Sequence, residues 1–317
     1  MLQFPKCFFE EEIRENFKVD RTMKTVWAAE LEVLNEIAKV CARHQLSWYV
    51  AYGSLLGAVR HQGFIPWDDD MDIWMPREDY MRFLRVAQNE LPDGFMVKSP
   101  LLEEYYHEFH SCVLNSETIS IEPEHLKKFH GCPFVVGIDI FPLDNLSLEK
   151  DEMQYVLFQT IRQGALMVKE GRRDREVEEI LDLIEKECDV TIGREYLQTE
   201  EKQDELQLEL VSGLWGLGNE IAMKHCDEDT RQVGMYLDYF KYGKKYEKKW
   251  FGNTKMYSYE SFEVPGPEEY DPVLKIIYGD YMTRYRNTAA HDYPFYKKQL
   301  EQLRNHVKRG EEKENNA

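Results

Sequence analysis

Residues 51–76 read AYGSLLGAVRHQGFIPWDDDMDIWMP, and this stretch decides the fold that we expect. Its acidic end carries Asp68, Asp69, Asp70 and Asp72, followed by apolar residues. A strand over residues 71–75 places side chains two positions apart on one face, so Asp70 and Asp72 are predicted to point the same way. Two carboxylates held this close repel each other unless a cation lies between them. Oxygen ligands of this kind suit a hard divalent ion such as Mg²⁺.

A further isolated acid, Asp139, lies inside the apolar run PFVVGIDIF over residues 133–141. This run predicts a buried strand, and a carboxylate is costly to bury unless it meets a cation or hydrogen-bond donors. An aspartate-rich surface turn that caps a helix is the alternative interpretation, because turns favour Asp. The apolar surroundings favour metal ligation, and we predict that Asp70, Asp72 and Asp139 are the catalytic and metal-binding carboxylates.

Gly53 and Ser54 follow a predicted strand over residues 47–51 and lie at the start of a predicted helix over residues 54–60. Free backbone N–H groups and a hydroxyl at such a position can hold a phosphate. A Gly-Ser pair alone is a common turn, but here it is followed by a D-x-D strand and by one later acid. This order matches the nucleotidyltransferase-like pattern. We therefore expect an α+β fold with a mixed sheet, flanking helices and a helical insertion or subdomain.

A long helix is predicted over residues 21–46, where apolar residues recur at steps of three and four. A second helix is predicted to begin at Pro76 and to run to about residue 89.

Three blocks of sequence resemble the LicD family, the phosphocholine transferases of bacterial surface polymers, which is similar to the fukutin-type phosphosugar transferases. They are GSLLGAVRHQGFIPWDDDMDIWMPREDY over residues 53–80, GIDIFPLD over 137–144 and VPGPEEYDPVLKIIYGDYM over 264–282. The resemblance implies a polymerase-β-type nucleotidyltransferase fold. It also implies that the three aspartates hold Mg²⁺, with Mn²⁺ as an alternative, and that Asp139 takes the proton from the attacking hydroxyl. By the same resemblance, Asp68 and Asp69 orient the loop or the metal ligands.

The resemblance further implies that Gly53 and Ser54 contact the phosphates of the donor. Arg60 is expected either to neutralise the transferred phosphoryl group or to be an exposed helix cation, and His61 to end that helix. Trp67 is assigned to the donor-binding residues, because aromatic faces hold a quaternary ammonium. Core packing is the alternative for Trp67 and for the other aromatic side chains of the motif, Tyr49, Tyr52 and Trp74. Tyr278 and Tyr281 are expected either to close the site or to pack the last helices on the sheet.

The implied reaction is transfer of phosphocholine, or of a similar group, from CDP-choline or another CDP-linked donor. The acceptor is a sugar hydroxyl of a cell-surface glycan, teichoic acid or lipopolysaccharide precursor. Two alternatives keep the fold: a nucleotidyltransferase that releases pyrophosphate, and a ribitol-phosphate-type phosphosugar transferase. A non-catalytic glycan-binding protein is a further alternative.

The chain has 317 residues, enough for one large domain or two modest ones. We expect a catalytic core over residues 1–147, a helical subdomain or insertion over 148–250, a strand and helices that complete the core over 251–308, and a disordered tail over 309–317. The insertion is predicted from its long helical patterns and its acidic runs.

Charge and cysteine content narrow the partners and the location. The formal net charge of −19 repels phosphate backbones, so we expect no binding to long nucleic acids. The six cysteines form no C-x-x-C pair, which argues against a zinc knuckle or a disulfide framework. The N-terminus lacks the features of a signal peptide, and no apolar run approaches a membrane span. We expect a cytoplasmic enzyme.

One basic and aromatic stretch, residues 241–250, opposes the global charge. It contains five lysines and Trp250, the lysines being Lys241, Lys244, Lys245, Lys248 and Lys249. Such a segment suits an anionic polymer or the anionic lipid that carries it. It predicts peripheral contact with the inner face of the membrane, and a solvated loop is the alternative.

Overall fold

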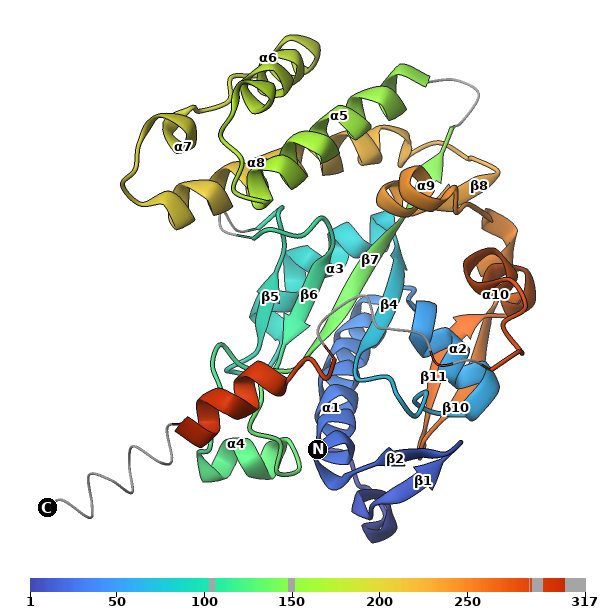
Figure 1. Ribbon diagram of the computed structural model, residues 1–317. Helices are drawn as coiled ribbons and strands as arrows, with labels where there is room; N and C mark the ends of the chain where they lie inside the picture. The colour runs from blue at the N-terminus through green and yellow to red at the C-terminus, as the bar shows by residue number, and fades with distance from the viewer. Residues whose placement is uncertain (103–105, 148–151, 285, 287–292, 306–317) are drawn as a thin grey trace, which may run out of the picture.

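The computed structural model describes residues 1–102, 106–147, 152–284, 286 and 293–305. Within this part of the chain, a mixed sheet of seven strands is flanked by helices (Figure 1), which confirms the expected α+β class. β4 and β7 are parallel, and the pairs on either side of them are antiparallel. In spatial order the strands are β3 (Tyr49–Val50), β4 (Met71–Pro76), β7 (Gly137–Leu146), β6 (Ser111–Leu114) and β5 (Met96–Lys98).

Two long helices pack against each other and against β7. α1 (Arg21–His44) begins after Asp20, whose side chain accepts a hydrogen bond from Met23 N at 2.9 Å, the usual N-cap arrangement. α3 (Arg77–Glu90) begins directly after Pro76. The helices predicted for these two segments are therefore confirmed. Their apolar faces, the sheet and the C-terminal elements share one buried core.

Two predicted boundaries differ from the structure. α2 spans Tyr52–His61, so it begins two residues earlier than the predicted helix over 54–60 and includes Gly53 as well as Ser54 in its first turn. The strand predicted over 133–141 is displaced towards the C-terminus and becomes β7. The N–H groups of Val135 and Val136 donate to the side chains of Gln299 and Asn115 instead of to a neighbouring strand, which delays the start of β7.

Residues 152–222 form a helical layer at one end of the sheet (Figure 1), with a second buried core of its own. Its helices are α5 (Glu152–Lys169), α6 (Arg175–Cys188), α7 (Glu195–Gln198) and α8 (Gln203–Ala222). The chain then returns to the sheet, where β8 pairs with the C-terminal end of β7. The elements that follow α8 are η2 (Met223–His225), β8 (Gln232–Gly234), α9 (Tyr236–Tyr242), β9 (Tyr246–Glu247) and η3 (Lys248–Phe251). The domain boundaries that we expected stay a prediction.

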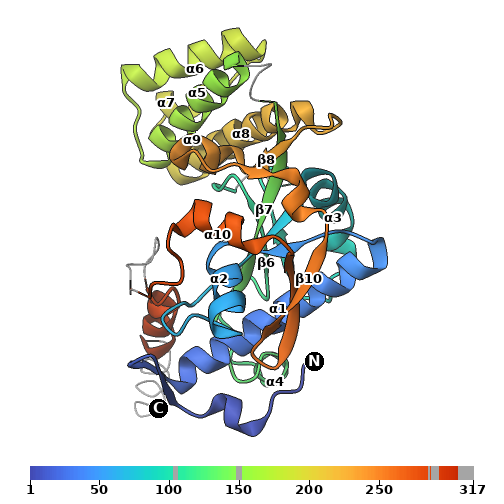
Figure 2. The same ribbon diagram turned by 90° about the vertical axis from the view of Figure 1, so that its right-hand side faces the viewer.

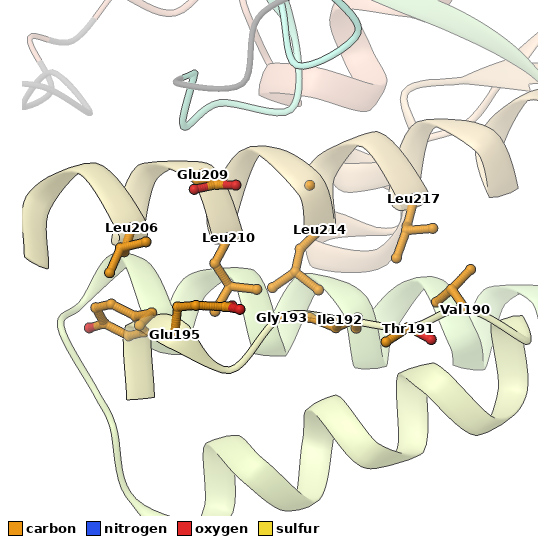
Figure 3. Close-up of a pocket in the computed structure, with 12 residues that line it drawn as sticks. Val190, Thr191, Ile192, Gly193, Glu195, Leu206, Glu209, Leu210, Leu214 and Leu217 are labelled. Carbon is orange, nitrogen blue, oxygen red and sulfur yellow. The ribbon is translucent and has the colours of Figure 1, made fainter. Parts of the chain in front are cut away.

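A pocket of about 390 Å³ lies between α8 and the segment that joins α6 to α7. Figure 3 shows Leu210 and Leu214 of α8 pointing towards Ile192 of that segment. The pocket is largely apolar and shares none of the predicted site residues.

The C-terminal part packs on the other side of the motif. α10 (Tyr270–Tyr278) lies beside α2 (Figure 2), and α2 also contacts the hairpin of β10 (Thr254–Tyr259) and β11 (Phe262–Pro267). The last described helix covers residues 297–305, and the predicted tail over 309–317 lies outside the described residues. The remaining elements are η1 (Lys6–Phe9), β1 (Glu12–Arg14), β2 (Phe17–Val19) and α4 (Pro123–Lys128). None of the helices described here combines the length and apolar character needed to cross a bilayer.

Candidate active site

Asp72 and Asp139 lie side by side on neighbouring strands. β4 and β7 are parallel, and Asp72 is in register with Asp139, so both side chains leave the same face of the sheet. Asp70 precedes β4 and lies two positions before Asp72. Burial raises the pKa of Asp72 well above its ordinary value, and the nearby charges of Asp70 and then Asp139 raise it further. The structure thus places Asp70 and Asp139 near enough to Asp72 for their charges to act on it, and their joint role as metal ligands stays a prediction.

His110 is a site residue that the sequence did not reveal. Its Nε2 lies 3.2 Å from Asp139 Oδ2, immediately before β6 begins. Burial lowers the pKa of His110, but the charge of Asp139, the hydrogen bond to it and the charge of Glu108 together outweigh burial, so the pKa is raised. The imidazole therefore contacts one oxygen of Asp139, its Oδ2. No local sequence pattern could have identified His110, because its contact with Asp139 forms only when β6 and β7 come together.

Gly53 and Ser54 join α2 to the aspartate strand. The backbone N–H of Asp72 donates to Ser54 Oγ at 2.9 Å, and Ser54 is 2% exposed. A Cβ at Gly53 would lie 2.7 Å from Asp68 Oδ2, so a larger residue would displace that carboxylate. Both residues lie in the first turn of α2, where the N–H groups have no acceptor within the helix. Their contact with a donor phosphate stays a prediction.

The acidic loop before β4 gathers three carboxylates, those of Asp68, Asp69 and Asp70, whose oxygens lie within 4.8 Å of one another. Asp69 is fully buried and accepts a hydrogen bond from Phe295 N at 2.6 Å. Trp27 Nε1 donates to the backbone oxygen of Asp68 at 2.9 Å. These contacts fix the loop from α1 and from the C-terminal segment.

Glu30 is a second residue that sequence reasoning missed. It lies on the buried face of α1 and is 1% exposed, and its Oε2 has no hydrogen-bond partner among the described residues. Burial raises the pKa of Glu30 well above its usual range, and Asp70, Asp69 and Asp68 raise it further. The sequence offered one signal for Glu30. It lies three positions after Trp27, and that spacing places both residues on the same apolar face of a helix.

The other predicted donor residues lie around this group. Arg60 Nη1 donates to the backbone oxygen of Tyr281 at 2.9 Å, which ties α2 to the segment after α10. Trp67 is half-buried and meets Phe17 edge-on, with ring centroids 6.3 Å apart. Trp74 is fully buried in the core. Roles for Arg60 and Trp67 in donor binding stay predictions.

Two tyrosines face the acids from opposite ends of the chain. Tyr52 has a positive φ of 39°, a strained conformation for a non-glycine residue. Its hydroxyl donates to Asp238 Oδ2 of α9 at 2.8 Å. Burial raises the pKa of Tyr278, and so do the charges of Asp68 and Asp72, which places its hydroxyl near these acids. Tyr281 instead donates its hydroxyl to Asp271.

Residues 45–129 match a family model described as "LicD/FKTN/FKRP, nucleotidyltransferase domain". The chain contains a LicD-family domain. The match includes Asp70 and Asp72 but ends before Asp139. Asp139 therefore lies outside the matched residues, but the pairing of β7 with β4 places it beside Asp72.

Curated relatives match this chain over segments of fewer than 70 residues. The lipopolysaccharide cholinephosphotransferase LicD of Haemophilus influenzae is 39% identical over 69 residues, which is 22% of this chain and 26% of that protein. An uncharacterized protein of Rickettsia typhi is 33% identical over 67 residues, 21% of this chain and 22% of that protein. One of Rickettsia prowazekii is 34% identical over 66 residues, 21% of this chain and 25% of that protein. The chain thus matches about a quarter of the length of these relatives.

The donor set around Asp72 fits a hard divalent cation. Its side-chain ligands are carboxylate oxygens, which Mg²⁺ prefers, and their mutual repulsion is visible in the raised pKa of Asp72. Asp70, Asp72 and Asp139 would hold such an ion. A cation held there would attract a phosphate towards an otherwise repulsive acidic surface.

Proposed function

We propose that the protein is a metal-dependent transferase with a nucleotidyltransferase-like fold, which transfers phosphocholine from CDP-choline to a sugar hydroxyl of a cell-surface glycan precursor. The observation that carries the proposal is the register of Asp72 with Asp139, beside Asp70 and the first turn of α2. The cholinephosphotransferase activity for which the Haemophilus influenzae relative is named supports phosphocholine as the transferred group.

The proposed reaction is an in-line displacement at phosphorus. The acceptor oxygen forms a bond to the phosphorus that carries choline, the bond from that phosphorus to the CMP oxygen breaks, and CMP leaves. Asp139, held by His110 through one oxygen, takes the proton of the hydroxyl on the other. The N–H groups of Gly53 and Ser54 bind the donor phosphates and orient them. Bound Mg²⁺ supplies neutralisation of the attacking and leaving oxygens.

The test is a screen of CDP-linked donors with a membrane glycan fraction as acceptor, in which CMP release is measured with Mg²⁺ and again with EDTA. We expect CDP-choline to give CMP and labelled glycan with Mg²⁺ only. Asp72→Asn should lose nearly all turnover, whereas Asp204→Asn, an exposed acid in the first turn of α8, should keep it. A fully active Asp72→Asn variant would show that the site is wrongly assigned.

The description of the matched family as a nucleotidyltransferase domain supports a second candidate, a nucleotidyltransferase that releases pyrophosphate. Incubation with labelled CTP or ATP and an assay for pyrophosphate separates the two reactions, because transfer from CDP-choline releases CMP and no pyrophosphate. The same screen includes CDP-ribitol, which would be preferred by a phosphosugar transferase. A location in the cytoplasm and membrane contact through residues 241–250 stay predictions.

A further inference from the structure

Helix α9 reaches the motif through Asp238. This residue lies in the first turn of α9, far along the chain from the motif, and its Oδ2 accepts the Tyr52 hydroxyl at 2.8 Å. Tyr52 begins α2, so Asp238 is anchored next to the turn that carries Gly53 and Ser54. A residue from outside the LicD-matched segment therefore faces the proposed donor site.

Asp238 brings a cation with it. Lys244 Nζ lies 3.7 Å from Asp238 Oδ2, and the two side chains are each only 16% exposed. The ammonium also lies 5.6 Å from the ring centroid of Tyr52 and 4.6 Å from that of Tyr242. A separation of 3.7 Å is longer than a hydrogen bond, so the ion pair with Asp238 does not engage the three N–H donors of Lys244. Asp238 therefore keeps Lys244 near the site without accepting a hydrogen bond from its ammonium group.

The other lysines of residues 241–250 whose side chains are described behave differently. Lys248 pairs at 3.5 Å with Asp229, whose side chain is fully exposed. Lys249 is exposed, and Lys245 is half-buried. Lys244 alone among these four side chains forms an ion pair with the acid that accepts the Tyr52 hydroxyl at the start of α2. The basic stretch therefore contains one lysine placed at the acidic site.

The negative charge of the site explains why a lysine would be needed there. A nucleotide diphosphate brings negative charge to a surface that already carries several carboxylates, and cations must offset both. Lysine binds phosphate as a mobile point charge on a flexible stem, and it can swing from Asp238 to a ligand without moving the backbone. We propose that Lys244 binds the diphosphate of the donor, and that Asp238 and Tyr52 hold it beside the site until the donor arrives. This inference rests on the proposed function.

The first test measures affinity for CDP-choline by calorimetry in Mg²⁺, with inorganic pyrophosphate as a second probe. We expect Lys244→Gln to weaken both by about tenfold, equivalent to about 1.4 kcal/mol, with KM for the donor raised more than kcat is lowered. Lys244→Arg should recover most of the affinity because it keeps the charge. Lys245→Gln is the matched control and should bind as the unmodified protein does.

Asp238→Asn separates binding from a structural role. Asparagine still accepts the Tyr52 hydroxyl but releases Lys244 and removes a negative charge, so donor affinity should stay equal or rise. If the ion pair only supports the fold, both substitutions should weaken donor binding together. That result, or unchanged affinity in Lys244→Gln, overturns the inference even where Lys244→Gln folds poorly. Failure of the unmodified protein to bind either probe would instead reject the proposed function.

Discussion

Asp72 on β4 and Asp139 on β7 are paired in register across two parallel strands. This pairing turns two acids that are distant in the sequence into neighbours on one face of the sheet. The raised pKa of Asp72, caused by burial and by the charges of Asp70 and Asp139, shows that the folded protein bears a cost for this proximity. Groups that strain a fold in this way occur often at functional sites.

Metal binding should relieve that cost. We expect Mg²⁺ to raise the Tm of the unmodified protein, because a ligand that binds only the folded state stabilises it. Asp72→Asn should raise the Tm measured in EDTA, by removing repulsion, and Asp72→Asn and Asp139→Asn should each reduce the gain from Mg²⁺. Thermal melts with and without the ion measure both effects. Equal gains from Mg²⁺ in all three proteins would contradict the assignment of these ligands.

Local patterns predicted much of this fold. The apolar spacing over residues 21–46 predicted α1, the apolar residues around Asp72 predicted β4, and Pro76 marked the start of α3. The D-x-D strand and the Gly-Ser turn could be found because their residues are close in sequence. The family match over residues 45–129 covers the same stretch.

The strand register and several site residues could not be predicted from the sequence, because they depend on tertiary contacts. The register of Asp139 with Asp72 depends on which strands pair, and no local signal specifies that. His110, Glu30 and Asp238 are single residues from three separate segments, each of which gains its place only through packing. The displaced start of β7 has the same origin, because side chains of distant residues take the N–H groups that a strand would use.

Glu30 should make stability depend on pH. Its folded pKa is raised by burial and by Asp70, so the folded state keeps a proton that the unfolded state loses. Stability is then fully present below the ordinary pKa of Glu, about 4.3, and is lost as the pH rises towards the raised folded pKa. Glu30→Gln should not show this loss of stability. The difference in the free energy of unfolding between the variant and the unmodified protein should therefore grow with pH.

Urea unfolding in EDTA between pH 5 and 8 measures that difference. Glu36→Gln on the same helix is the control, since Glu36 pairs with Lys39 at 2.7 Å near the surface. Parallel pH profiles for Glu30→Gln and the unmodified protein would mean that Glu30 is not buried as an acid.

Gly57 should tolerate no side chain. A Cβ there would lie 2.4 Å from the backbone oxygen of Gly63, which cannot move aside as a flexible side chain can. We expect Gly57→Ala to lower the free energy of unfolding and to disturb α2, because overpacking costs about 1–3 kcal/mol. Gly213→Ala in α8 is the matched control, since a Cβ there meets nothing within 4 Å. It should stabilise by about 0.5–1 kcal/mol through helix propensity. Equal effects in urea unfolding would contradict the close approach at Gly57.

Arg77 should be required for the contact between the sheet and the helical layer. Its Nε lies 2.6 Å from Asp144 Oδ1 of β7, and its Nη1 donates to Asn219 Oδ1 of α8 at 2.9 Å. Arg77 and Asp144 are both buried, and burial raises the pKa of Asp144 in spite of the opposing charge of Arg77.

Arg77→Met leaves the Asp144 carboxylate buried without its partner, so we expect a loss of about 3–5 kcal/mol in the free energy of unfolding. Asp144→Asn added to that variant should restore part of the loss, because it removes the uncompensated charge. Arg175→Met tests an exposed ion pair, with the Arg175 side chain 88% exposed, and should cost about 0–1 kcal/mol. Comparable losses for Arg77→Met and Arg175→Met in denaturant unfolding would show that the Arg77 network does not join the two layers.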